Sequence, residues 1–343
     1  MLIILIVVAF LGLYRLNTAA VSDKTDSVSI EVKDGNNYFT IASLLKDNNL
    51  IKSEFFYKIF LKIHRPTGLI TGTYELNQSM SVSEIVETLS NKNNLKNTSI
   101  KLTFKEGIRI TNMADIIEEK AGIPAEDFIK TVNDDEYIDT LINKYWFITN
   151  DVKNDDLYYK LEGYLFPDTY ILDKDELDSK TIIQKILDNT DDKLSSLKQS
   201  IEGSDYSIHQ LLTLASIIEL EAVTDDDRAN VAGVFYNRLN NSWSLGSDVT
   251  TYYAAKKSMT ESLTKSELND CNGYNTRCTS MKGLPIGPID NPSLSSINAA
   301  INPSSNNYYY FVADSEKKVY FTKNATEHAN IIAKLKKEGK WIG

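Results

Sequence analysis

The segment SIHQLLTLASIIELEA, Ser207 to Ala222, constrains the fold more than any other part of this sequence. Its apolar residues cover most of a helical circumference, which predicts a helix buried on nearly all sides. Such a helix needs other elements packed around it. The chain can supply them, because 42% of its 343 residues are hydrophobic and this length predicts two or three domains.

Two carboxylates interrupt the apolar surface of this helix, Glu219 and Glu221. Glu219 shares its face with small residues one turn earlier, which leave room for a substrate, whereas Glu221 is nearer the solvated end. Desolvation by such neighbours favours the protonated form that a general acid needs. Glu219 is therefore the better candidate acid. The alternative is an ordinary salt bridge, for which Arg228 and Arg238 are available.

Composition also points to carboxylate chemistry. The chain has 47 acidic and 37 basic side chains, and the net charge of −10 argues against a nucleic-acid-binding face. The three histidines, His64, His209 and His328, are too scattered for a histidine metal site or a histidine-based triad. No phosphate loop, dinucleotide fingerprint or metal cluster is found, so we predict no cofactor and no metal.

The N-terminal run MLIILIVVAFLGL is apolar and uncharged. As a helix it would rise about 20 Å, short of the ~30 Å hydrocarbon core of a bilayer. We interpret residues 1–20 as a membrane anchor whose true start lies slightly upstream. A signal peptide cleaved near Thr18-Ala19-Ala20 and a buried core segment are the alternatives. The anchor and the signal peptide would both place residues 21–343 outside the cytoplasm.

Two stretches offset by 72 residues resemble each other: EVKDG (31–35) matches TFKEG (103–107), and residues 41–58 match 113–130. Each copy predicts a strand, a glycine-containing turn and an amphipathic helix, although any strand–turn–helix could give such a likeness. Between them, residues 72–76 predict a strand, and Ser81 with Glu84 predicts a capping box that opens a helix through Leu89. We expect a polysaccharide-binding module over 28–95 and a second strand–helix module over 98–150.

Residues 155–343 are expected to form a larger domain, which makes the fold class α+β. Residues 132–160 have little periodicity and are interpreted as a connection. Helices are predicted over 179–197 and 206–222, a hairpin over 308–322 and a short helix over 327–337. In LGSDVTTYYA (245–254), Asp248 is predicted to cap a helix.

Two loops of this larger domain carry groups that could line a cleft. LEGYLFPDTY (161–170) gathers two carboxylates and three aromatic rings around a glycine and a proline, and an ordinary buried turn is the alternative. GLPIGPIDNPS (283–293) is a rigid, irregular loop, because proline fixes the backbone path and glycine permits close approach.

Cys271 and Cys278 flank the six residues NGYNTR. Outside the cytoplasm a disulfide could close this loop, and two free thiols are the alternative. A zinc site would need two more ligands, which no nearby histidine supplies.

Together these segments resemble the membrane-anchored endolytic murein transglycosylases, the YceG-like family. The motifs that carry the resemblance are LEGYLFPDTY, LASIIELEA (214–222), VAGVFYNRL (231–239), LGSDVTTYYA, YNT (274–276) with GLPIGPI, and INPSSNNYYYFVAD (301–314). The resemblance implies a single-pass protein of the cell membrane, with a LysM-like module and an extracytoplasmic catalytic domain. It also implies peptidoglycan glycan strands as substrate and penicillin-binding proteins or other cell-wall synthesis proteins as partners.

The resemblance makes Glu219 the catalytic residue of a lytic transglycosylase, a polysaccharide lyase. The family cuts nascent strands between N-acetylmuramic acid and N-acetylglucosamine and so limits strand length. The muramyl C6 hydroxyl attacks C1, no water is used, and a 1,6-anhydro end remains. Polar and aromatic side chains of the same motifs are expected to contact sugar: Glu162, Tyr164, Phe166, Asp168, Tyr236, Asn237, Asp248, Tyr274 and Asn275.

Two other functions stay open at this point. The chain could be a non-catalytic scaffold that binds cell-wall glycan. It could also be a glycoside hydrolase in which Asp248 or Glu162 is the second carboxylate beside Glu219.

Overall fold

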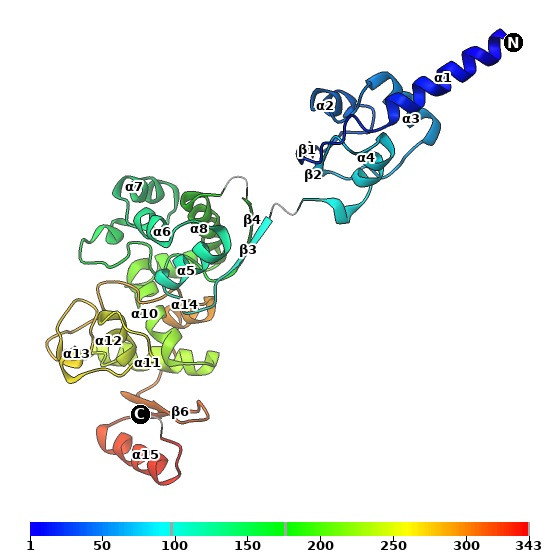
Figure 1. Ribbon diagram of the computed structural model, residues 1–343. Helices are drawn as coiled ribbons and strands as arrows, with labels where there is room; N and C mark the ends of the chain where they lie inside the picture. Colours follow the sequence, from blue (N-terminus) through cyan, green and yellow to red (C-terminus); the bar gives the residue numbers. More distant parts are fainter. Residues whose placement is uncertain (97–98, 175–176, 342–343) are drawn as a thin grey trace. The chain divides into compact units, whose positions relative to one another are not determined.

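The computed structural model describes residues 1–96, 99–174 and 177–341, and it divides the chain into two compact units. Unit 1 spans Met1–Ser99 and unit 2 spans Ile100–Gly343. Both contain helices and short antiparallel strands, so the predicted α+β class is confirmed (Figure 1). The elements of unit 1 are α1 (Leu2–Thr18), β1 (Val28–Val32), α2 (Ala42–Asp47), α3 (Glu54–His64), β2 (Gly72–Leu76), α4 (Val82–Leu89) and the 3₁₀ turn η1 (Lys92–Asn94).

Unit 2 is mostly helical and begins within β3 (Ser99–Thr103), which pairs with β4 (Thr169–Asp173). Its helices and 3₁₀ turn up to the central helix are α5 (Ile110–Ala121), α6 (Ala125–Val132), α7 (Asp135–Lys144), η2 (Asn150–Lys153), α8 (Ser179–Ser195), α9 (Lys198–Glu202) and α10 (Ile208–Glu221). After it come α11 (Asp225–Asn240), α12 (Asp248–Ala254), α13 (Lys265–Asn269), α14 (Leu294–Ile301), β5 (Tyr310–Ala313), β6 (Val319–Thr322) and α15 (Ala325–Lys337).

The core of unit 1 is built on a two-stranded antiparallel sheet. β1 pairs with β2 so that Ile30 lies opposite Tyr74, and both side chains are buried. The predicted capping box is confirmed: the Ser81 hydroxyl accepts from the Glu84 amide, and the Glu84 carboxylate accepts from the Ser81 amide. The predicted strand at 72–76 and the helix after it are therefore both present.

The N-terminal segment expected to be a membrane anchor forms α1, whose apolar side chains are largely exposed. Among the residues that the structure describes, no helix is long and apolar enough to cross a membrane.

Each copy of the apparent repeat forms a strand followed by two helices rather than one. In the first copy Asn49, at φ +55°, separates α2 from α3. In the second, Gly122 at φ +71° and Pro124 separate α5 from α6. A left-handed residue cannot continue a helix, so each predicted helix breaks there. The second copy shares one continuous core with the rest of unit 2.

Helix α10 lies in the middle of unit 2, as its sequence predicts (Figure 1). Ser207 and Gln210 form a capping box at its start, and the helix is buried from Leu211 through Ile218. Helices α14 and α11 pack directly against it. Each fully buried leucine or isoleucine contributes about 1.5–3 kcal/mol, so this helix anchors the unit.

The interpretation of residues 132–160 as a connection is wrong. Asp134 accepts a hydrogen bond from the Tyr137 amide and starts α7, which buries Tyr137, Ile138 and Leu141. The helix is short, and its charged residues obscure the apolar stripe in the sequence.

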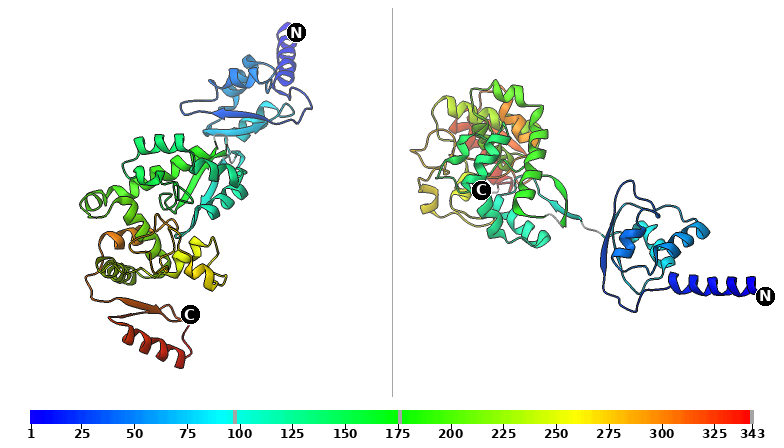
Figure 2. Two further views of the ribbon diagram at one scale, coloured as in Figure 1. Left: turned by 90° about the vertical axis from the view of Figure 1, so that its left-hand side faces the viewer. Right: turned by 90° about the horizontal axis from the view of Figure 1, so that it is seen from above.

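The predicted C-terminal hairpin and final helix are confirmed. β5 and β6 pair with Tyr310 opposite Thr322, and α15 packs on them through Leu335. Figure 2 shows these elements, coloured orange to red, together at one end of unit 2.

Candidate active site

Glu219 lies in the last turn of α10, and its side chain is only 7% exposed. Its Oε2 accepts from the Ser293 amide at 2.9 Å, the Ser293 hydroxyl at 2.5 Å and the Ser296 hydroxyl at 2.7 Å. These donors stand at the start of α14, which Ser293 caps. The buried packing of α10 on α14 therefore fixes the orientation of this carboxylate.

Arg228, in the first turns of α11, faces the other oxygen of Glu219. Its Nη2 lies 3.3 Å from Glu219 Oε1, and its Nη1 donates to the Val223 carbonyl and to Asp225. The arginine side chain is 11% exposed, so the ion pair is shielded from water. Of the two arginines considered from the sequence, Arg228 is the partner. Arg238 donates instead to the carbonyls of Tyr309 and Leu245.

Gly107, the last residue of TFKEG, lies in the turn after β3 and packs against the Glu219 side chain. Its φ of +73° favours glycine, and a Cβ placed there would lie 3.4 Å from Glu219 Cγ. The Gly107 amide donates to the Asn291 carbonyl, which ties this turn to the loop 283–293. Gly107 is not among the site residues predicted from the sequence, where it stands out only as the glycine of the apparent repeat.

Asp290 is a second carboxyl beside Glu219 that sequence reasoning missed. It is fully buried, and neither of its oxygens has a hydrogen-bond partner among the described residues. Its Oδ2 lies 4.0 Å from the same Cβ position on Gly107. Burial and the neighbouring Glu219 and Glu162 raise the pKa of Asp290 well above its usual range. The only sequence signal was an acid inside a proline-rich loop.

Glu162 is also buried, but its carboxyl is fully bonded. It accepts from the Ile110 amide at 2.9 Å, from Asn291 Nδ2 at 3.0 Å and from the Tyr253 hydroxyl at 3.1 Å. Burial raises its pKa to about 7 against these hydrogen bonds. At 1% exposure it joins three segments of the chain and presents no surface to a sugar.

Glu221, on the same helix as Glu219, has different surroundings. Its Oε1 accepts from the Ser247 hydroxyl at 2.5 Å, and burial raises its pKa. The prediction that Asp248 caps α12 is wrong. The N-cap is Ser247, while Asp248 lies in the first turn and pairs with Arg277 at 2.6 Å. The partner of the Asp248 carboxylate is therefore Arg277, a residue of the loop 271–278.

Most of the aromatic and amide residues proposed as sugar contacts are packed or hydrogen-bonded within the protein. Tyr164 is buried, with its hydroxyl 2.8 Å from His209 Nδ1, and Phe166 is 8% exposed. Asn237 donates to the Tyr308 carbonyl, and the Tyr236 hydroxyl donates to the Ala300 carbonyl. None of these contacts brings the side chain to Glu219.

Asp168 and Tyr274 are likewise engaged with the protein. Asp168 pairs with Lys193, and its carboxylate hydrogen bonds lower its pKa. The Tyr274 hydroxyl accepts from the Tyr158 amide.

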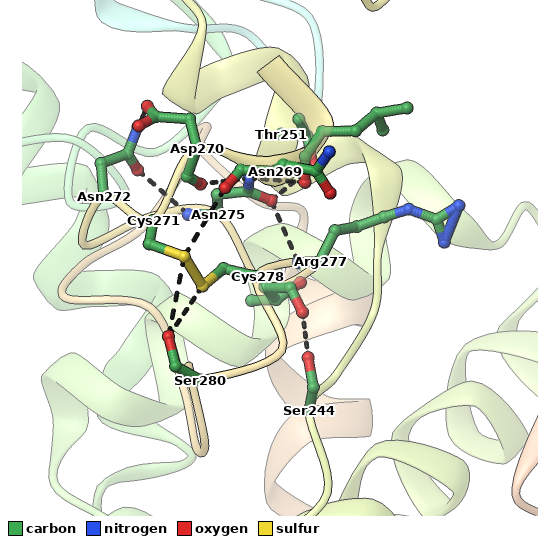
Figure 3. Close-up of a disulfide and its surroundings, with 12 residues drawn as sticks. Ser244, Thr251, Asn269, Asp270, Cys271, Asn272, Asn275, Arg277, Cys278 and Ser280 are labelled. Carbon is green, nitrogen blue, oxygen red and sulfur yellow. Dashed lines mark hydrogen bonds between the residues drawn. A yellow bond between two sulfur atoms is a disulfide. The ribbon is translucent and has the colours of Figure 1, made fainter. Parts of the chain in front are cut away.

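The loop with the two cysteines is closed by a Cys271–Cys278 disulfide (Figure 3). Inside it, the Asn275 amide group donates to the Asp270 carbonyl at 2.6 Å and accepts from the Thr251 hydroxyl at 2.7 Å. Ser244 donates to the Thr276 carbonyl on the same loop. The disulfide and Asn275 thus brace α12 and the Ser247–Glu221 contact rather than the Glu219 carboxylate.

A cavity of about 380 Å³ is lined by Gly107, which lies against Glu219, and by Leu220, the next residue of α10. Polar groups that suit sugar hydroxyls line it, among them Arg109, Asn112 and Ser258. A larger cavity of about 640 Å³ lies beside Ser207, at the opposite end of α10 from Glu219. The smaller cavity is the better candidate site, because Gly107, which lines it, lies against both Glu219 and Asp290. Within the described part of the chain, no cluster of three or more acidic, histidine or cysteine side chains could hold a metal ion.

Comparison with known proteins decides the family. The model of the YceG-like family matches residues 30–334, most of the chain. The chain belongs to the YceG-like family. The endolytic murein transglycosylase of Bacillus subtilis is 34% identical over 307 residues, which cover 89% of this chain and 84% of that protein.

Further YceG-like relatives agree with this assignment. The endolytic murein transglycosylase of Streptococcus pneumoniae D39 is 32% identical over 321 residues, covering 89% of this chain and 58% of that protein. The crystal structure of a putative yceG-like protein from Listeria monocytogenes superposes with a TM-score of 0.64 at 32% identity. That match covers 90% of this chain and all of the other.

Proposed function

We propose that this protein is an endolytic murein transglycosylase and that Glu219 is its single catalytic acid and base. The observation that carries the proposal is the Glu219 carboxylate, held by Ser293, Ser296 and Arg228, with its neighbours Gly107 and Leu220 lining a polar cavity. Membership of the YceG-like family and the names of the relatives support the same activity.

The proposed reaction proceeds in two proton transfers. Protonated Glu219 gives its proton to the glycosidic oxygen between N-acetylmuramic acid and N-acetylglucosamine. As the C–O bond breaks, the muramyl C6 hydroxyl attacks C1, and the Glu219 carboxylate takes the hydroxyl proton. The products are a 1,6-anhydro end and a free 4-hydroxyl, with no water consumed. The four donors around Glu219 stabilise its carboxylate form between the two transfers.

An internal nucleophile explains why one carboxylate can be enough. A hydrolase usually needs a second carboxylate at a defined distance across the scissile bond. Glu162 is bonded to three protein donors and Asp248 is paired with Arg277, which argues against either carboxylate as that base. Holding the C6 hydroxyl against C1 supplies much of the rate by proximity.

The remaining assignments are proposals of the same kind. We assign catalysis to unit 2 and glycan binding to a LysM-like module within residues 28–95, a compact strand-and-helix unit. We further propose that α1 anchors the protein in the cell membrane, with both units outside the cytoplasm. The exposure of its apolar side chains supports this role. Cell-wall synthesis proteins, including penicillin-binding proteins, are the proposed partners.

Paired Gln substitutions test the assignment of Glu219. Glu219→Gln should keep the fold and glycan binding but abolish the release of anhydro-muropeptides from uncrosslinked glycan strands. Glu221→Gln is the matched control, two residues away on the same helix, because its amide can still accept from Ser247. Retained cleavage by Glu219→Gln, or equal loss in both variants, would remove Glu219 from its role.

A further inference from the structure

Helix α3 of unit 1 has two apolar faces, and only one of them belongs to the core. Tyr57, Phe60 and Leu61 are buried in unit 1. On the opposite side, Phe55 is 64% exposed and Ile63 is 61% exposed. We call the outer face, formed by Phe55, Ile59 and Ile63 at four-residue spacing, the α3 stripe. Large apolar side chains left in water at helical spacing mark an interaction surface rather than chance.

The α3 stripe is continuous with the exposed apolar surface of α1. The Phe10 and Phe56 rings lie 6.1 Å apart, and Phe56 in turn packs edge-on against Phe55 at 5.3 Å. Lys52, just before α3, donates to the Leu16 carbonyl near the end of α1. Figure 1 shows α1 projecting from unit 1 with α3 beside its base. Whatever surrounds the apolar helix α1 therefore also reaches the start of the stripe.

Basic groups border the stripe on the side away from α1. Lys62 and Arg65 are exposed and line a cavity of about 610 Å³ together with Phe39, which is 46% exposed. The nearby acid Glu54 is paired with Lys58 at 2.8 Å, so its charge is offset. This basic edge contrasts with the chain as a whole, whose net charge is −10. An apolar stripe with a basic edge is the pattern of a helix that lies in the headgroup region of an anionic bilayer.

We propose that the α3 stripe is a second membrane contact, which lies in the headgroup region of an anionic bilayer beside α1. The proposal rests on the proposed membrane association of α1, but it names a different surface. Phe55 and Ile63 enter the boundary between headgroups and acyl chains, while Lys62 and Arg65 bind lipid phosphates. A two-point contact of this kind would fix the orientation of unit 1 on the membrane, which a single helix cannot do.

Site-specific labels on the full chain test the contact. The two cysteines are joined in the disulfide, so Phe55→Cys, Ile63→Cys and Leu5→Cys each provide a unique thiol for an environment-sensitive fluorophore. Ile171→Cys is the matched control, 67% exposed on β4 of unit 2. The probe is a phosphatidylcholine vesicle containing phosphatidylglycerol and a headgroup-linked quencher. We expect quenching at positions 55 and 63 and none at 171.

The outcomes separate this proposal from that of the anchor. Quenching at position 5 without quenching at 55 and 63 overturns the α3 contact and leaves the anchor standing. Quenching at 55 and 63 without burial of position 5 supports the contact and contradicts the anchor, and quenching at none of the three contradicts both. If the labels at 55 and 63 respond to protein concentration without vesicles, the stripe binds a second copy and the membrane proposal is wrong.

The basic edge predicts a dependence on lipid charge. Changing Lys62 and Arg65 to glutamine should weaken binding to phosphatidylglycerol-containing vesicles by roughly fivefold per residue. Binding to pure phosphatidylcholine vesicles should not change. Lys323→Gln, an exposed lysine of unit 2, is the control and should bind as the wild type does. Equal binding of all variants to anionic vesicles would overturn the role of this edge.

Discussion

Replacing Glu162 by glutamine should make unit 2 more stable at neutral pH. A glutamine can keep two of these hydrogen bonds and reverse the third. Its oxygen can accept from the Ile110 amide and Asn291, and its amide can donate to the Tyr253 oxygen, whose hydroxyl donates to Glu162 in the wild type. The substitution therefore removes only the ionisation of the buried carboxyl. The pKa of Glu162 is about 7 in the folded protein, against an ordinary value of 4.5.

The sign and size of the effect follow from this difference. Below pH 4.5 the carboxyl is protonated in both the folded and unfolded states, so it contributes no pH dependence. Between pH 4.5 and about 7 the unfolded chain releases a proton that the folded protein retains, so stability falls as pH rises. At about 1.4 kcal/mol per tenfold change in proton activity, the total loss is roughly 3 kcal/mol and stays constant at higher pH. For a unit of this size, that is roughly 6–12 °C in Tm.

Tryptophan fluorescence can measure the unfolding of this unit alone, because Trp146, Trp243 and Trp341 all belong to unit 2. The free energies of unfolding of wild type and Glu162→Gln should coincide near pH 4 and diverge by roughly 3 kcal/mol by pH 8. Glu118→Gln, an exposed residue of α5, is the control and should follow the wild type. A constant difference between wild type and Glu162→Gln at all pH values would refute the reasoning.

Three further predictions concern the surroundings of the site. Gly107→Ala should cost about 1–2 kcal/mol of backbone strain and reduce glycan cleavage at least tenfold; Gly122→Ala, at a similar φ of +71° in open space, should show the strain without the loss of activity. Arg228→Gln should lower Tm, because it leaves the nearly buried Glu219 carboxylate without its cation; an unchanged Tm would contradict the ion pair. Replacing both Cys271 and Cys278 by serine should cost roughly 2–3 kcal/mol by chemical unfolding, with the catalytic rate retained at low temperature; an abolished rate would place the loop in the site instead.

The sequence alone predicts the parts of this fold that depend on local pattern. The apolar circumference of Ser207–Ala222 predicts a buried helix, and the spacing around 308–322 predicts a hairpin; both are present. The capping box at Ser81 and Glu84 is equally local. Residues 135–144 escape the same reasoning because their charged side chains hide a short apolar stripe.

The surroundings of Glu219 could not be predicted in the same way. Gly107, Asp290 and Ser293 come from turns far from α10 in the chain, and only tertiary packing brings them to its end. The sequence offered two arginines as partners, and the distances select Arg228. Several polar residues expected to contact sugar, among them Glu162 and Asn237, hydrogen-bond to distant parts of the chain, and a motif alone does not reveal such partners.

The central claim, that a single glutamate cleaves glycan by intramolecular attack, is tested most directly by the mass of the products. Uncrosslinked glycan strands would be incubated with the full chain in water enriched in oxygen-18, and the new muramyl ends analysed by mass spectrometry. We predict 1,6-anhydro ends without the isotope, and no new ends with Glu219→Gln. Reducing ends that carry the heavy oxygen would show hydrolysis and contradict the account, and the absence of new ends with the wild-type protein would do the same.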